Sequence, residues 1–202
     1  MTASTWASGT SSDPRPRGRA GCVATSLVLI ALLSWVALPA TADRKVRRVH
    51  QTPQEFIEES FPGREVESKA LWVIGDLKQQ VRQVLGHDLD RLRVRYWVDG
   101  QRTAWILDEI GKEELITVGV IVDAGRIERV NILVYRESRG WEVRFPIFTD
   151  QFHGAVVAEN GTRLDRRIDG ISGATLSVRA VRGLARLALI LDRNVEHPRG
   201  ES

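Results

Sequence analysis

The chain is poor in the residues that carry metal and disulfide chemistry. It contains 1 cysteine, Cys22, and 4 histidines among 202 residues. The histidines are scattered without metal-ligand spacing, at His50, His87, His153 and His197. A single cysteine excludes an intramolecular disulfide, a thiolate-bound iron–sulfur cluster and c-type haem attachment. Redox chemistry in this protein therefore needs a bound organic cofactor.

Two further absences concern nucleic acids and nucleotides. The formal net charge is only +3, and no basic stripe with interleaved aromatic residues is present, which argues against nucleic-acid binding. The dinucleotide fingerprint G-x-G-x-x-G between a strand and a helix is also missing. The sequence thus predicts neither a nucleic-acid partner nor a site for a soluble nicotinamide nucleotide.

The N-terminal region has the composition of a secretory signal. Arg15, Arg17 and Arg19 precede an apolar run at 23–38, which ends in Ala-Thr-Ala-Asp at 40–43. A basic start, an apolar centre and a small-x-small ending predict a signal peptide over 1–42, cleaved after Ala42. The alternative is an uncleaved anchor, although the run is shorter than the roughly 20 apolar residues that usually span a membrane. Because Cys22 precedes the run, its position argues against a lipoprotein.

The rest of the chain divides into a linker, one domain and a tail. Residues 43–51 are a charged segment, which we interpret as a solvated linker; contact with anionic lipid headgroups is the alternative. Residues 52–193 have the length of a single domain of about 150 residues. Residues 194–202 are predicted to be a disordered tail.

Hydrophobic periodicity predicts an α+β domain, with an antiparallel or mixed sheet and flanking helices. Alternating apolar and polar residues predict strands at 92–98, 103–107, 115–122 and 127–135, and a short apolar run predicts another at 70–74. Thr52-Pro53-Gln54-Glu55 has the pattern of a helix capping box. Asp76 is expected to cap a second helix that ends at Gly86, and a last helix is expected over 178–191.

The most informative stretch, Asp169-Gly170-Ile171-Ser172-Gly173-Ala174-Thr175, directly precedes the last predicted helix. Small residues before Thr175 leave its hydroxyl sterically open, close to helix N-terminal N–H groups that favour a phosphate. An ordinary turn with Ser172 or Thr175 as helix cap is the alternative. A cap alone, however, does not require Asp169, Gly170, Gly173 and Ala174 together.

The sequence D-G-I-S-G-A-T at 169–175 resembles the flavinylation site of the FMN-binding domain in subunits of sodium-pumping quinone reductases and Rnf-type electron-transport complexes. The resemblance implies that Thr175 carries FMN through a phosphoester bond, which a separate flavin transferase installs. It further implies that the cofactor site includes Asp169, Gly170, Ser172, Gly173, Ala174 and Leu176. The predicted hairpin 115–135, with Gly119 in its first strand, is also similar to this family.

The segment after this hairpin, 135–142, takes the place of a family loop that contains glutamate and glycine and lies near the flavin ring. Here Ser138 and Arg139 replace the usual Thr-Pro. Trp141 would supply a stacking face for the ring, and Glu137 an acceptor for its N–H. The alternative places Trp141 in the core and pairs Glu137 with an arginine. Arg179 is the nearest candidate to face the flavin phosphate, although the helix arginines also fit a solvated face.

These observations predict an exported electron-transfer flavoprotein that relays electrons between membrane or periplasmic redox partners. Its expected location is the periplasm or the outer face of the cytoplasmic membrane, and it resembles an electron carrier or oxidoreductase subunit more than a stand-alone enzyme. Two alternatives stay open. One is a structural or assembly module without flavin, and the other is a flavin-dependent reductase of a small substrate. No acid–base constellation beside the motif supports the second.

Overall fold

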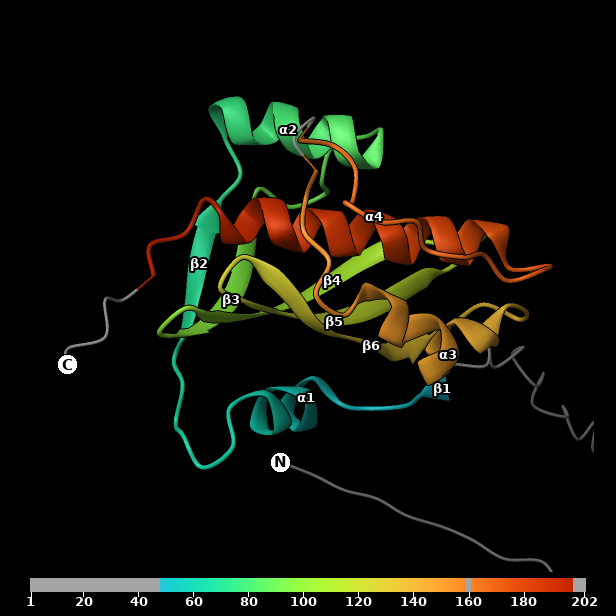
Figure 1. The fold of residues 1–202 in the computed structure, drawn as a ribbon, viewed down its shortest axis with the longest axis horizontal. Coiled ribbons are helices and arrows are strands. Elements are labelled where there is room, and N and C mark those ends of the chain that lie inside the picture. The colour runs from blue at the N-terminus through green and yellow to red at the C-terminus, as the bar shows by residue number, and fades with distance from the viewer. Residues whose placement is uncertain (1–47, 159–160, 198–202) are drawn as a thin grey trace, which may run out of the picture. The chain divides into compact units, whose positions relative to one another are not determined.

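A computed structural model describes residues 48–158 and 161–197 of the chain (Figure 1). The predicted signal peptide 1–42, with Cys22, lies outside the described residues, as do 43–47 of the linker and 198–202 of the tail. Within the described part, no helix is both long and apolar enough to cross a bilayer.

Six strands form one antiparallel sheet in the order β1-β6-β5-β4-β3-β2. They are β1 (Arg48–Val49), β2 (Ser68–Trp72), β3 (Arg93–Asp99), β4 (Arg102–Ile110), β5 (Leu115–Asp123) and β6 (Arg126–Tyr135). The five strands predicted from the sequence are all present, and the two-residue strand β1 adds to one edge. The α+β class is thereby confirmed.

Tight turns connect the central strands and set their register. Ala124 and Gly125 between β5 and β6 have φ angles of 48° and 74°. Two consecutive positive φ angles are typical of the two-residue hairpin turn whose twist matches the sheet. Strands β4 and β5 pair without interruption from Arg102 with Asp123 to Ile110 with Leu115. The predicted hairpin 115–135 is confirmed, because β5 and β6 pair antiparallel across this turn.

Helices cover both faces of the sheet (Figure 1). Helix α4 (Thr175–Asp192) packs on one face, α2 (Gly75–Leu85) packs against α4 on the same side, and α1 (Pro53–Ser60) packs on the other face. The seven inner residues of β5 are buried because that strand is covered from both sides. Gly119 of β5 faces α1, and a Cβ atom there would lie 2.6 Å from the Phe56 ring. Glycine at this position thus lets α1 approach the sheet.

The helix caps predicted from the sequence are confirmed in part. The capping box of α1 is present: Glu55 N–H donates to Thr52 Oγ1 at 3.2 Å, and Thr52 N–H donates to Glu55 Oε2 at 2.7 Å. Gly86 ends α2 with a φ of 85°, as predicted. The prediction that Asp76 caps α2 is wrong, because the N-cap residue is Ile74 and Asp76 lies within the first turn. There its charge still favours the positive end of the helix.

A buried polar chain ties the C-terminal end of α4 to strand β4. Trp105 Nε1 donates to Thr103 Oγ1 at 2.9 Å, and Thr103 Oγ1 donates to Asp192 Oδ1 at 2.6 Å. All three side chains are buried. Since a buried polar group left without a partner costs free energy, these bonds fix how α4 lies on the sheet.

Candidate functional site

Helix α4 begins at Thr175, three residues before the predicted start, so the S-G-A-T stretch runs directly into the helix. Ile168, Ala174 and Ser177 are buried and anchor the stretch, whereas Thr175 and Leu176 are exposed. Because the anchors lie on both sides of Thr175, its side chain is held at the surface in a fixed place. This display suits a residue that is modified or that binds a ligand.

The first turn of α4 is attached to the end of β6 through Tyr135. The Tyr135 hydroxyl donates to the Arg139 carbonyl at 2.5 Å and lies 2.9 Å from Ser177 Oγ. Since the single hydroxyl hydrogen of Tyr135 is used toward Arg139, Ser177 is the donor in the second bond. Burial raises the pKa of Tyr135, which keeps this hydroxyl protonated. Tyr135 and Ser177 were not predicted as site residues, because the sequence gives no sign that they meet.

Two of the small residues are required by close packing and backbone conformation. Gly173 has a φ of 79°, a left-handed conformation that other residues rarely adopt. A Cβ atom at Gly140 would lie 3.0 Å from the Ala174 Cβ and 2.9 Å from the Tyr135 hydroxyl. The loop before Trp141 therefore approaches the start of α4 so closely that only small residues fit at both positions.

The start of α4 has no side-chain cap. Its N-cap residue is Ala174, whose side chain has no acceptor atom, so the alternative of a cap by Ser172 or Thr175 is wrong. Within residues 48–158 and 161–197, no acceptor is found for the backbone N–H groups of Thr175, Leu176 and Ser177. Free N–H groups and the positive end of the helix dipole attract an anion such as phosphate.

The remaining residues of the motif contribute little to the fold. The Asp169 N–H donates to Gln151 Oε1 at 2.6 Å, but the Asp169 carboxylate is exposed and lies 3.6 Å from Arg167. A Cβ atom at Gly170 would meet no neighbour within 4 Å, and Ser172 is exposed. Since packing does not require these residue types, their presence is better explained by a ligand or a modifying protein.

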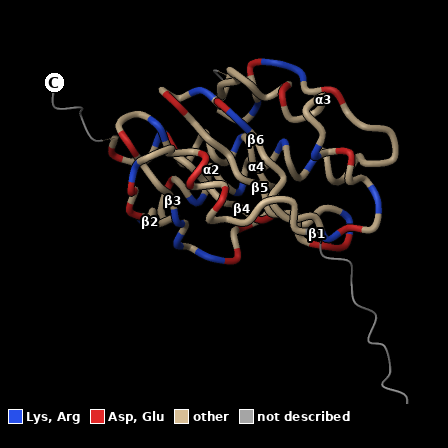
Figure 2. The backbone as a smooth tube through the Cα atoms, turned by 90° about the horizontal axis from the view of Figure 1, so that it is seen from below, with Lys and Arg blue, Asp and Glu red and all other residues tan. Residues whose placement is uncertain are grey.

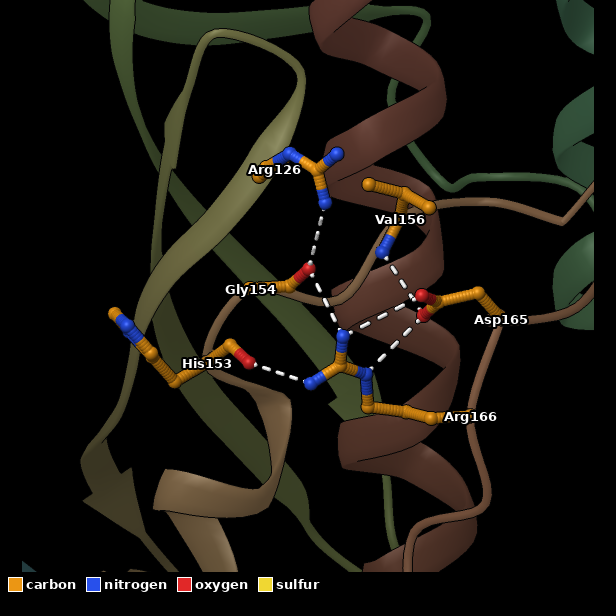
Figure 3. A network of polar contacts seen from close by, with 6 residues as sticks. All are labelled: Arg126, His153, Gly154, Val156, Asp165 and Arg166. Atoms are coloured by element: carbon orange, nitrogen blue, oxygen red, sulfur yellow. Dashed lines mark hydrogen bonds and ion pairs between the residues drawn. The ribbon is translucent and has the colours of Figure 1, made fainter.

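Segment 163–168, which leads into the motif, is fixed by Arg166 (Figure 3). Its guanidinium donates to the backbone carbonyls of His153 at 2.8 Å and Gly154 at 3.1 Å, and it pairs with Asp165 at 3.2 Å. Asp165 also accepts the Val156 N–H at 3.2 Å. These bonds hold the segment beside α4. Sequence reasoning did not single out Arg166, because its partners are mostly backbone carbonyls.

Two cavities lie beside the first half of α4, and both are lined by Arg179 and Arg186. The first, of about 380 Å³, is lined by α2, the end of β4 and α4: Gln83, Val84, Leu85, Gly86, His87, Glu109, Ile110, Gly111, Leu176, Arg179, Ala180, Gly183 and Arg186. The second, of about 420 Å³, is lined by Arg163, Leu164, Arg166, Arg167, Ile168, Arg179, Arg182 and Arg186. Volumes of this size are typical of small-molecule sites.

An ion pair lies in the wall of the first cavity, the α2–α4 cavity. His87 Nε2 is 3.1 Å from Glu109 Oε1, and its Nδ1 is 2.8 Å from the Asp88 carbonyl. The bond to the Asp88 carbonyl and the charge of Glu109 together raise the pKa of His87 against the effect of burial. Among the described residues, no group of three His, Cys, Asp or Glu side chains is arranged to hold a metal ion.

Glu137, the expected acceptor for the flavin ring, organises the β4–β5 turn. Its Oε1 accepts the N–H groups of Lys112, Glu113 and Glu114, the latter two at 2.7 and 3.0 Å. Burial favours the neutral acid, but these bonds outweigh it and hold the pKa of Glu137 below its usual range. The alternative of an arginine partner is wrong, because these backbone groups are its partners. A contact between Glu137 and the flavin ring stays a prediction.

Trp141 is partly buried and packs against the main core. Its ring meets Phe145 edge-on, with centroids 5.1 Å apart, and the Arg144 guanidinium lies 4.9 Å from its centroid. The alternative that Trp141 belongs to the core is therefore correct for the part of its ring that packs against the core. Stacking of Trp141 on a flavin also stays a prediction.

Thr175 is thus an exposed threonine at an uncapped helix start, close to arginines and to two cavities of small-molecule size. Residues 111–190 match the family model of the FMN-binding domain. The match supports a flavin-binding protein. No curated protein sequence and no solved structure gave a match.

Proposed function

We propose that FMN is bound covalently, through a phosphoester to Thr175 Oγ1, and that the protein is an electron carrier. The observation that carries this proposal is the exposed Thr175 hydroxyl at a helix start whose first N–H groups have no acceptor among the described residues. Those N–H groups and the nearby Arg179 would stabilise the negative charge of the phosphodiester.

The attachment needs an activated donor and a transferase. We propose that the donor is a flavin dinucleotide, because its phosphoanhydride bond can be exchanged for the new ester. The bond from Thr175 Oγ1 to the flavin-side phosphorus forms, the anhydride bond breaks, and a nucleoside monophosphate leaves. The hydroxyl proton of Thr175 passes to a base of the transferase. No redox change accompanies this step.

Once attached, FMN supplies one- and two-electron transfer, which no side chain of this protein supplies. The covalent bond keeps the cofactor at the protein regardless of the flavin concentration around it. That property matters most for a protein outside the cytoplasm, where a released flavin would diffuse away. Export by the N-terminal segment is consistent with this role, and the proposed partners are a flavin transferase and a redox protein of the periplasm or membrane.

Denaturing gel electrophoresis tests the attachment. The full-length protein, co-expressed with a flavin transferase of this type, should give a fluorescent flavin band, and Thr175→Ala should give none. Thr175 caps nothing, so the variant should keep its unfolding free energy within about 0.5 kcal/mol. Ser138→Ala removes another exposed hydroxyl near the site and should keep the band.

Two results would contradict the proposal. A fluorescent Thr175→Ala band would move the attachment elsewhere, and a wild-type protein without a band would favour the assembly module. Intact-mass measurement tests export separately: the mature chain should begin at Asp43, whereas a chain that retains 23–38 would support an uncleaved anchor.

A further inference from the structure

The α2–α4 cavity begins directly beside the proposed attachment residue. Its lining includes Leu176, the residue after Thr175, and continues along α4 through Ala180 and Gly183. At about 1.5 Å per residue, this stretch of helix is about 10 Å long. A ring linked to Thr175 by a ribityl chain and a phosphate can therefore reach into the cavity along the helix.

Helix α2 and the end of β4 supply the other walls of the cavity, at 83–87 and 109–111. The packing of α2 on α4 fixes these walls, since a Cβ atom at Gly183 of α4 would lie 3.4 Å from Leu85 Cδ2 of α2. Most of these wall residues precede 111–190, the range that matches the FMN-binding family model. The match therefore assigns them no role.

Exposed apolar side chains flank the cavity. Ile110 is 58% exposed and Leu176 is 42% exposed, and both line it. Leu115, the cross-strand partner of Ile110, is also exposed. Acidic and basic residues, by contrast, are interspersed along the described backbone, so charge singles out no face (Figure 2). Apolar side chains gathered at a cavity indicate a ligand with an apolar surface.

The pair of His87 and Glu109 forms a polar wall of the same cavity. His87 Nε2 lies 3.1 Å from each carboxylate oxygen of Glu109, and Glu109 Oε1 also accepts the Ile110 N–H at 3.0 Å. These bonds fix the position of the carboxylate. Apolar walls with a few placed polar groups are typical of small-molecule sites.

Glu137 supports the β4 wall from behind. A Cβ atom at Gly111 would lie 2.7 Å from Glu137 Oε1, the atom that also accepts the N–H groups of Glu113 and Glu114. Glu137 thereby fixes the turn that follows Ile110. The segment that resembles the family loop near the flavin ring thus acts on the α2–α4 cavity.

We propose that the α2–α4 cavity binds the isoalloxazine ring of the flavin, with Ile110 and Leu176 as apolar contacts and the His87–Glu109 pair as polar contacts. The ring has an apolar benzenoid end and a pyrimidine end with a hydrogen-bond donor and acceptors, so both kinds of wall have a counterpart. The cavity volume of about 380 Å³ is in the range of small-molecule sites. The proposal rests on the proposed attachment of FMN to Thr175.

Riboflavin, which has the ring but no phosphate, tests the cavity without the attachment. In equilibrium dialysis, full-length protein produced without a flavin transferase should bind about one riboflavin per chain. Ile110→Ser should raise the dissociation constant about fivefold or more, because it removes apolar contact area. Ile147→Ser is the matched control, since Ile147 is 84% exposed in α3 (Pro146–Thr149) and does not line the cavity. The control should change the constant by less than about twofold.

The attached flavin tests the same cavity in the loaded protein. Iodide should quench the flavin fluorescence of the full-length, flavinylated protein less than that of free FMN. Ile110→Ser should raise the quenching constant about twofold or more, because the ring spends more time in solvent. His87→Gln should shift the flavin absorption maximum, since it changes a polar contact of the ring. His153→Gln, at an exposed histidine that does not line the cavity, should not shift it.

Several outcomes would overturn the proposal. They are quenching of the attached flavin as strong as that of free FMN, equal effects of Ile110→Ser and Ile147→Ser, and an unshifted spectrum of His87→Gln. Exposure of the ring by Trp141→Leu but not by Ile110→Ser would place the ring at Trp141, which does not line the cavity. A missing gel band contradicts the attachment at Thr175 instead. Riboflavin dialysis then decides: saturable binding that Ile110→Ser weakens supports the cavity, and absence of binding overturns it.

Discussion

The hydroxyl of Tyr135, at the end of β6, lies 2.9 Å from Oγ of Ser177 in the first turn of α4. The same hydroxyl donates to the Arg139 carbonyl, so one side chain joins the sheet, the following loop and the start of the helix. Thr175 is two residues from Ser177, and the position of its hydroxyl depends on this junction. The fold thereby holds Thr175, the proposed attachment residue, rigidly, as precise chemistry at a site requires.

Replacing Tyr135 with phenylalanine should destabilise the protein by about 1–3 kcal/mol, because the buried Ser177 hydroxyl and the Arg139 carbonyl lose their partner. Denaturant titration measures the change. Tyr96→Phe is the matched control, since Tyr96 is also buried but its hydroxyl has no hydrogen bond among the described residues. The control should cost less than about 0.5 kcal/mol, and equal costs would show that the junction contributes nothing.

Replacing Gly140 with alanine should cost about 2–4 kcal/mol. Its φ of 83° strains any other residue, and the new Cβ would also clash with Tyr135 and Ala174. Gly125→Ala isolates the strain, because Gly125 has a similar φ of 74° and no neighbour within 4 Å. It should cost only about 1–2 kcal/mol. Thermal unfolding of both variants measures the difference in stability. If Gly140→Ala destabilises the protein no more than Gly125→Ala, the close approach of the loop to the helix is refuted.

Stability should depend on pH through His87. Its pKa is raised in the folded state, so its contribution is complete below the ordinary histidine value and is lost as the pH rises through the raised value. The effect should be small, because the side chain is 53% exposed. Unfolding free energies at about pH 5.5 and about pH 8 should differ less in His87→Gln and Glu109→Gln than in wild type. If the unfolding free energy of both variants depends on pH as in wild type, a stabilising interaction between His87 and Glu109 is refuted.

The flavin-loaded protein should react only slowly with NADH. A nicotinamide nucleotide usually binds a fingerprint within a parallel strand–helix–strand unit, whereas every strand pair of the described sheet is antiparallel. Dithionite should reduce the protein, and electrons would otherwise arrive through a docked partner. Stopped-flow mixing measures the rate. Rapid, saturable bleaching by NADH would reveal a nucleotide site and favour the reductase alternative.

Much of the fold, and the candidate attachment residue, could be proposed from local sequence. Alternation of apolar residues predicted most of the strands, the turn at 123–126 predicted the hairpin of β5 and β6, and the 169–175 stretch singled out Thr175. The capping box of α1 was equally visible. These features depend on residues that are neighbours in the chain, and local chemistry therefore specifies them.

Only the tertiary structure decided which groups surround Thr175. Tyr135 meets Ser177 across 42 positions of sequence, and Glu137 bonds to the backbone of a turn more than 20 residues away. The cavity of about 420 Å³ likewise joins the arginines of α4 to the segment 163–168. Such contacts depend on how helix and sheet pack, since packing brings together residues with no shared local signal. The sequence by itself determined where the motif with Thr175 lies in the chain, and the packing determined what holds Thr175 and what lies beside it.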